Sequence, residues 1–156
     1  MPTSDPTASA TVAVGATPEA VYRLITDLSV MTELAEETAV LRWRKGAGAE
    51  PGAVFRGTNR NGWRRWTTTC TVTDADPGRR FAFNVSHTSL PVARWQYDIE
   101  ATLDGCTVTE STWDRRYGWF ALASRPVTGV ADRADVNTRN IEATLQRLKA
   151  RAERTA

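Results

Sequence analysis

Between residues 38 and 114 the chain alternates apolar and polar residues in six short runs that are separated by turn residues. A period of two is typical of β-strands with one buried face. Short connections join neighbouring antiparallel strands, whereas parallel strands need much longer crossovers. The pattern therefore predicts an antiparallel meander with one apolar face. The predicted strands are 40–44, 54–60, 63–73, 81–87, 95–99 and 108–114.

Turn residues set the expected pairing of these strands. Asn61-Gly62 and Asp104-Gly105 favour two-residue hairpin turns, and further turns are expected at 74–78 and 89–91. Alternate residues of a strand share a face, so each hairpin assigns side chains to faces. The first hairpin groups Phe55, Gly57, Asn59, Trp66, Thr68, Cys70 and Val72, and the second groups Trp95, Tyr97, Ile99, Val108, Glu110, Thr112 and Asp114.

The residues before the meander predict one strand and two helices. Alternation indicates a short strand at 10–14. Thr17 is a good N-cap and Pro18 suits the first helical position, so a helix should begin there and run to about residue 27. A second short helix is expected through Met31 and Leu34.

A long amphipathic helix is predicted at 130–150. At about 1.5 Å per residue it would be on the order of 30 Å long, so it needs a broad apolar surface to pack on. Its apolar row consists of Val130, Ala134, Ile141, Leu145 and Leu148, and Asn137 interrupts that row.

The predicted fold class is α+β, with the order β-α-α-β6-α. A curved, seven-stranded antiparallel sheet would wrap around the long C-terminal helix, with the two short helices between the first and second strands. One domain is expected over 10–152, after a disordered Pro/Thr/Ser-rich tail at 1–9.

Composition excludes several classes of protein. The chain has 20 basic and 18 acidic residues, a balance too even to indicate nucleic acid as a partner. Arginines and tryptophans do interleave at 60–66, but alternation turns Trp66 inward and Trp63 outward. No apolar run approaches the ~18 residues of a membrane span.

The two cysteines lack metal-ligand spacing and suit a reducing compartment, and no signal peptide is evident, so we expect a cytoplasmic protein. With one histidine and no phosphate-binding glycine loop, we expect no metal and no cofactor. The sequence leaves a monomer and a homodimer open.

The predicted inner face combines large rings with isolated polar groups. A solid core rarely buries such groups together, because each must find a partner or lose several kcal/mol. Apolar walls with a few converging polar groups are typical of ligand pockets. We therefore expect a cavity whose ligand contacts are Trp43, Phe55, Asn59, Trp66, Thr68, Phe83, Trp95, Thr112, Asn137 and Ile141.

Several short motifs stand out along the chain: ATPEAVY (16–22), RWTT (65–68), PGRRFAF (77–83), VARW (92–95) and VTE (108–110), together with Asn137 and Thr144-Leu145. These motifs and the order of elements resemble the polyketide cyclase/dehydrase and lipid-transport family of the START-like helix-grip superfamily. The resemblance covers about residues 10–150. It implies a tunnel for a hydrophobic or aromatic ligand between the sheet and the last helix, and it provides no universal catalytic motif.

Three residues are candidates for proton transfer. Glu110 should lie among Trp95, Tyr97 and Ile99, where desolvation would raise its pKa and make it a usable acid or base. Alternatively, it pairs with an arginine or reaches the cavity mouth. His87 could act as a general base, or could be a half-exposed histidine at a strand end. Tyr97 is a tentative third member.

Two other elements have open alternatives. Asn137 could hold a ligand carbonyl or bond to Glu110 or Thr112 across the hollow. The aromatic segment 117–122 could form a lid over the cavity mouth or a short helix that covers the sheet edge.

The sequence therefore supports hypotheses from different classes. The protein could carry or sequester an apolar, aromatic or lipid-like small molecule, or it could cyclise or dehydrate a polyketide-like one. A protein-interaction role through the outer face, with Trp63 and Trp113, is a third hypothesis.

Overall fold

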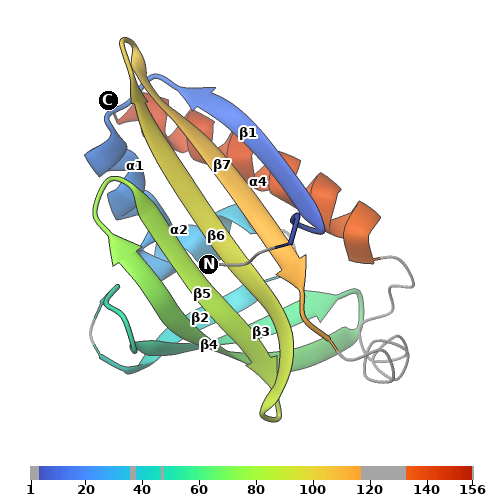
Figure 1. Cartoon of the computed structure of the whole chain (residues 1–156). Helices are drawn as coiled ribbons and strands as arrows, with labels where there is room; N and C mark the ends of the chain where they lie inside the picture. The colour runs from blue at the N-terminus through green and yellow to red at the C-terminus, as the bar shows by residue number, and fades with distance from the viewer. Residues whose placement is uncertain (1–3, 36–37, 47, 117–132, 156) are drawn as a thin grey trace.

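The computed structural model describes residues 4–35, 38–46, 48–116 and 133–155 (Figure 1). Within these residues one sheet is covered by helices on one face. The elements are β1 (Ala8–Val14), α1 (Pro18–Ile25), α2 (Leu28–Leu34), β2 (Thr38–Lys45), β3 (Val54–Asn61), β4 (Arg64–Asp76), β5 (Arg80–His87), β6 (Leu90–Thr102), β7 (Gly105–Asp114) and α4 (Arg133–Arg154).

The seven strands form a single antiparallel sheet with the order β1-β7-β6-β5-β4-β3-β2. Strands β2 to β7 follow one another as a meander, and β1 returns to pair with β7. Helix α4 packs against β1 and β7, and the sheet curves around one side of the helix (Figure 1). The predicted fold class, a helix-grip arrangement, is confirmed.

Two of the predicted hairpin turns lie one residue away from their predicted positions. Asn61 pairs with Arg64, so the loop is Gly62-Trp63, and Thr102 pairs with Gly105, so the other loop is Leu103-Asp104. Gly62 has φ 65°, and glycine at the first loop position is the pattern of a type II′ turn. Both registers therefore shift by two residues, and a shift of two leaves every side chain on its predicted face.

The prediction of a turn at 89–91 was wrong. The loop is Thr88-Ser89, with φ 49° and 69°, and positive φ at both loop positions is the type I′ geometry that suits a hairpin. Pro91 instead lies inside β6, opposite Ser86 and next to a register irregularity. Proline has no N–H to donate to the hydrogen-bond ladder, so inside a sheet it is tolerated only where the ladder is interrupted, as at such a bulge.

The helix boundaries follow from their caps. Thr17 Oγ1 accepts a hydrogen bond from the Ala20 N–H at 3.1 Å, as predicted. Helix α1 ends at Ile25, before the expected residue 27, because Asp27 caps α2 by accepting from the N–H groups of Ser29 and Val30. Helix α4 extends four residues beyond the predicted end at 150, and its added turn buries Ala152.

The core lies between the inner face of the sheet and the helices. Phe55, Phe81 and Val108 of the sheet and Ile141 and Leu145 of α4 are among its fully buried side chains. The thiols of Cys70, on β4, and Cys106, on β7, are free and buried. None of the helices in the described residues is long and apolar enough to span a membrane.

Candidate functional site

A buried tyrosine–carboxyl pair lies on the inner face of the sheet. Tyr97 of β6 and Glu110 of β7 are direct cross-strand partners. The Tyr97 hydroxyl donates a hydrogen bond of 2.9 Å to Glu110 Oε2. The two residues are only 2% and 3% exposed. The β6–β7 register thus brings together two of the three residues that the sequence suggested for proton transfer.

Burial determines the charge state of this pair. Desolvation raises the pKa of Glu110 to about 8, although the Tyr97 hydrogen bond works in the opposite direction. Burial and the neighbouring Glu110 raise the pKa of Tyr97 well above 10. Near neutral pH both groups are therefore mostly protonated. The expected rise in the Glu110 pKa is confirmed, and within the described residues Glu110 forms no ion pair with an arginine.

One oxygen of the carboxyl group has no protein partner. Glu110 Oε1 is buried and has no hydrogen bond to any residue that the structure describes. A buried polar atom in this state costs about 1–3 kcal/mol relative to a satisfied one. Such atoms are uncommon in folded proteins and need an explanation.

The other predicted polar contacts lie on the same face of the sheet or on α4. The Thr112 hydroxyl donates to the Arg94 carbonyl at 3.0 Å. The Asn59 amide donates to the Thr68 hydroxyl, also at 3.0 Å, across the β3–β4 pair. Asn137 is buried on α4, one turn before the fully buried Ile141. The buried Thr144 of α4 belongs to the same region and was missing from the predicted contacts.

Aromatic rings form a continuous series beside this polar region. Trp43 contacts Phe55 edge-on with ring centroids 5.4 Å apart, and Phe55 contacts Phe83 in the same way at 5.1 Å. Phe83 in turn contacts Phe81 at 5.5 Å. Phe81 lies opposite Tyr97 in the sheet and was not among the predicted ligand contacts, although its alternation places it there.

The two remaining tryptophans of the predicted site are half-buried. Trp95 lies between Phe83 and Thr112 in the cross-strand register and packs against the core. Trp66 pairs with Asn59, farther along the sheet.

His87 is separated from the Tyr97–Glu110 pair. It lies at the end of β5, six residues beyond the cross-strand partner of Tyr97, which is roughly 20 Å along a strand. Its ring is half-buried, and Nδ1 lies 2.6 Å from the Thr67 carbonyl oxygen. This geometry fits the strand-end alternative. The proposed lid at 117–122 lies outside the described residues.

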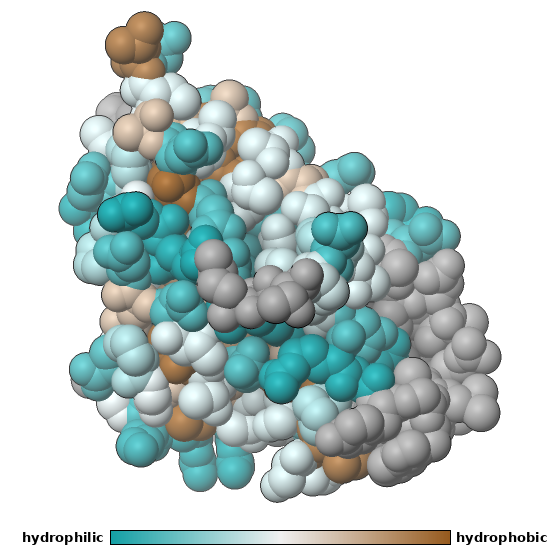
Figure 2. Space-filling model, viewed as in Figure 1, coloured by the Kyte–Doolittle hydropathy of each residue, from teal (hydrophilic) through white to brown (hydrophobic). Residues whose placement is uncertain are grey.

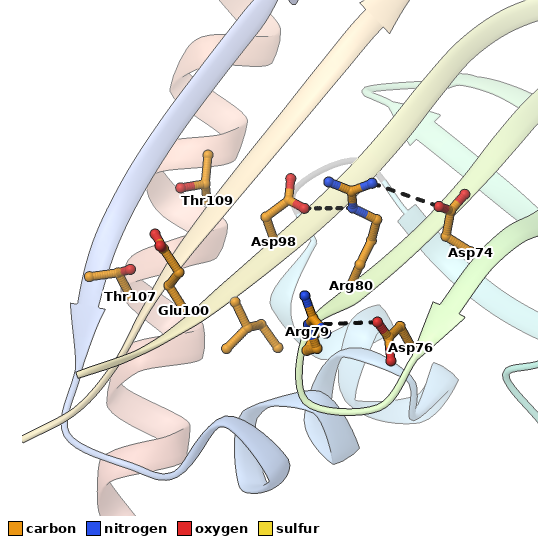
Figure 3. Close-up of a pocket in the computed structure, with 9 residues that line it drawn as sticks. Asp74, Asp76, Arg79, Arg80, Asp98, Glu100, Thr107 and Thr109 are labelled. Atoms are coloured by element: carbon orange, nitrogen blue, oxygen red, sulfur yellow. Dashed lines mark hydrogen bonds and ion pairs between the residues drawn. The ribbon is translucent and has the colours of Figure 1, made fainter. Parts of the chain in front are cut away.

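The outer face of the sheet has a different character. Arg80 pairs with Asp98 at 2.7 Å, and Arg94 pairs with Asp74 at 3.2 Å and with Gln96. A groove of about 390 Å³ is lined by Asp74, Arg80 and Asp98 of these pairs, and Figure 3 shows further charged and hydroxyl side chains around it. Figure 2, which looks onto this face, shows mainly hydrophilic residues across its centre. Such a groove does not suit an apolar ligand.

The two tryptophans of the protein-interaction hypothesis lie apart. Trp63 is 81% exposed at the tip of the β3–β4 hairpin, with the Arg64 guanidinium over its ring. Trp113 is half-buried on β7, and its indole N–H donates to the Ser4 carbonyl. They therefore do not form one apolar patch.

Three solved structures share this architecture. Protein CV1439 from Chromobacterium violaceum is 14% identical, with a TM-score of 0.68 over 93% of this chain and 95% of that one. TTHA0849 from Thermus thermophilus is 19% identical, with a TM-score of 0.69 over 96% and 98%. The di-domain ARO/CYC StfQ from the steffimycin biosynthetic pathway is 15% identical, with a TM-score of 0.71 over 94% of this chain and 50% of StfQ.

At these identities the structural likeness establishes the fold alone, and no curated protein matches the chain. The family described as polyketide cyclase / dehydrase and lipid transport matches residues 5–153. Because that match spans nearly the whole chain, the protein belongs to the polyketide cyclase/dehydrase and lipid-transport family.

Proposed function

We propose that the protein binds a hydrophobic small molecule, aromatic and polyketide-like or lipid-like, between the inner face of the sheet and α4. The observation that carries the proposal is the unpartnered Glu110 oxygen, buried on the face that bears the aromatic series. A solid core gains nothing from such an atom, whereas a ligand site uses a few polar groups in apolar walls to orient its occupant.

The family and one structural neighbour support a polyketide-like ligand. The family description includes both polyketide cyclases and lipid transport. StfQ is described as an ARO/CYC of a biosynthetic pathway, and this chain spans about half of it.

Catalysis by the same site is an extension of this proposal. A protonated Glu110 could act as a general acid towards a ligand carbonyl, with Tyr97 holding the carboxyl group in place. The aromatic walls would hold a flexible chain in a folded, reactive geometry, where effective molarity is the main contribution to rate. The reaction would be that of a cyclase or dehydrase.

A non-catalytic carrier is the second candidate. Within the described residues the only titratable partner of Glu110 is Tyr97. The raised pKa of Tyr97 keeps its hydroxyl protonated near neutral pH, so Tyr97 cannot act as a base there. An acid without a nearby base can orient a ligand without turning it over.

A dye-displacement assay tests the binding proposal. Nile red should brighten with the protein, and polycyclic aromatic ketones should displace it. Trp95→Ala should weaken dye binding about tenfold or more, because it removes part of the inner wall. Trp63→Ala, at the exposed hairpin tip, is the matched control and should leave affinity unchanged.

The absence of dye binding, or equal weakening by both substitutions, would contradict an inner site. Mass spectrometry of molecules that copurify would identify a natural occupant. Glu110→Gln then separates the two candidates, because an enzyme should lose turnover and keep affinity, whereas a carrier has no turnover to lose.

A further inference from the structure

The unpartnered oxygen of Glu110 carries chemical information about the ligand. The Tyr97 hydroxyl lies 2.9 Å from Oε2 and has no other acceptor among the described residues, so its proton is satisfied only when it donates to Oε2. A carboxylic acid has a single proton, and with Oε2 accepting, that proton belongs on Oε1. Oε1 is thus a buried O–H donor for which the described residues provide no acceptor.

We propose that Glu110 binds the ligand as a neutral acid and donates a hydrogen bond from Oε1 to a carbonyl oxygen, so that the site selects uncharged, ketone-bearing aromatic molecules over carboxylates such as free fatty acids. This inference rests on the proposed function. It adds the chemical class of the ligand and the atom that recognises it.

The surroundings of Glu110 support a neutral acid. On β1 its cross-strand neighbour is Ala10, and on β6 it is Tyr97, which is flanked on β5 by Phe81. Helix α4 packs on β7, and among its side chains that the structure describes the buried ones carry no charge. They are Asn137, Ile141, Thr144, Leu145, Leu148 and Ala152.

No cation among these neighbours would compensate a ligand carboxylate, and burying it beside Glu110 would be costly. The rise of the Glu110 pKa to about 8 is consistent with this picture.

Three naphthalene probes of similar size separate the alternatives. Methyl naphthyl ketone offers an acceptor, ethylnaphthalene offers none, and naphthoate carries a negative charge. At about pH 6 the ketone should bind roughly tenfold more tightly than ethylnaphthalene, because only the ketone satisfies the buried donor. Naphthoate should bind most weakly. Displacement of Nile red or calorimetry measures all three affinities.

The preference should depend on pH. As the pH rises through about 8, Glu110 loses the proton it donates, so the ratio of ketone to ethylnaphthalene affinity should fall towards one. In Tyr97→Phe the midpoint should move to higher pH, because the Tyr97 hydrogen bond lowers the pKa of Glu110. A merely structural pair would not couple the ratio to pH.

Two variants at position 110 make the test specific. Glu110→Gln keeps an N–H donor and cannot ionise, so the ketone preference should persist at every pH. Glu110→Met keeps the size and removes the donor, so the preference should vanish at every pH. Retained binding of ethylnaphthalene shows that each variant is folded.

The outcomes distinguish the two proposals. Binding of the probes without a ketone preference at about pH 6, or tighter binding of naphthoate, overturns this inference and leaves the inner binding site standing. A preference that survives in Glu110→Met also overturns it. Failure of every probe to bind overturns the proposed function and this inference with it.

Discussion

At the scale of single residues, the main feature is a carboxyl group that is buried where its ionisation is unfavourable. Glu110 is 3% exposed, and its one described partner is the hydroxyl of Tyr97. A protein that needed only stability would place an apolar residue there. The free-energy cost of ionising the buried Glu110 is therefore expected to appear in the pH dependence of the free energy of unfolding.

Stability should fall with rising pH because of Glu110. Its pKa is about 8 in the folded protein and near 4.5 when exposed, so the folded state binds the proton more tightly. The contribution of Glu110 to the free energy of unfolding should be largest below about pH 4.5, decline by several kcal/mol up to about pH 8 and then level off.

Urea unfolding of the wild type and Glu110→Gln across this range measures the effect, and the variant should lack this slope. Glu142→Gln, on the exposed side of α4, is the control and should follow the wild type. Identical slopes for the wild type and Glu110→Gln would contradict the raised pKa.

At the scale of elements, α4 is held by one row of buried side chains and by contacts at its end. Leu145 and Leu148 are 2% and 1% exposed. Near the C-terminus, Glu153 accepts from the Gly15 N–H at 2.8 Å and pairs with Lys149. The helix is thus attached to β1 and to the turn that follows β1.

Truncation of the buried row should be costly. Leu145→Ala should lower the free energy of unfolding by about 2–5 kcal/mol, since it removes a buried side chain and leaves a cavity. Gln146→Ala, at the next and exposed position of the same helix, should change it by less than about 0.5 kcal/mol. Similar losses in both variants would show that α4 is not packed through this row.

Gly105, the first residue of β7, lies close against the backbone at the end of β1. A Cβ at this position would clash with the Val14 carbonyl oxygen and approach Ala16 N to 2.9 Å, and the residue has φ 148°. Gly105→Ala should therefore destabilise the protein by at least about 3 kcal/mol.

Gly52→Ala is the matched comparison, because Gly52 also has a positive φ, of 89°, but its Cβ would meet no atom within 4 Å. Its loss should be only about 1–2 kcal/mol. Thermal or urea unfolding of the two variants separates backbone strain from the close contact, and equal losses would contradict the contact.

At the scale of the whole molecule, the two ends of the described chain close the structure. Strand β1 pairs with β7, about a hundred residues away, and α4 packs on both of them. The sheet edge and the helix therefore depend on each other, as expected of a single cooperative unit.

Cooperativity can be observed with two probes. Tryptophan fluorescence reports on the sheet, which carries the half-buried Trp43, Trp66, Trp95 and Trp113, and far-UV circular dichroism reports on the helices. Their urea transitions should coincide, and Leu145→Ala should move both midpoints together. A helix signal lost at lower urea than the fluorescence signal would show that α4 unfolds independently.

Local sequence patterns predicted most of this architecture. Alternation at Phe81, Phe83 and Val85 identifies a strand and its buried face, and Thr17-Pro18 marks the start of α1, because each of these signals acts over a few residues. The turn at Thr88-Ser89 was missed, because neither residue is typical of a type I′ turn.

The sequence by itself determined the order of the elements and which side chains face inward, since these depend on the local periods of strands and helices. The tertiary structure decided the pairing. A loop at 104–105 would place Tyr97 opposite Thr112, and only the observed register places it opposite Glu110. The size of the shift in the Glu110 pKa also depends on the tertiary structure. Desolvation is caused by atoms that β1, β5 and α4 bring from distant parts of the chain.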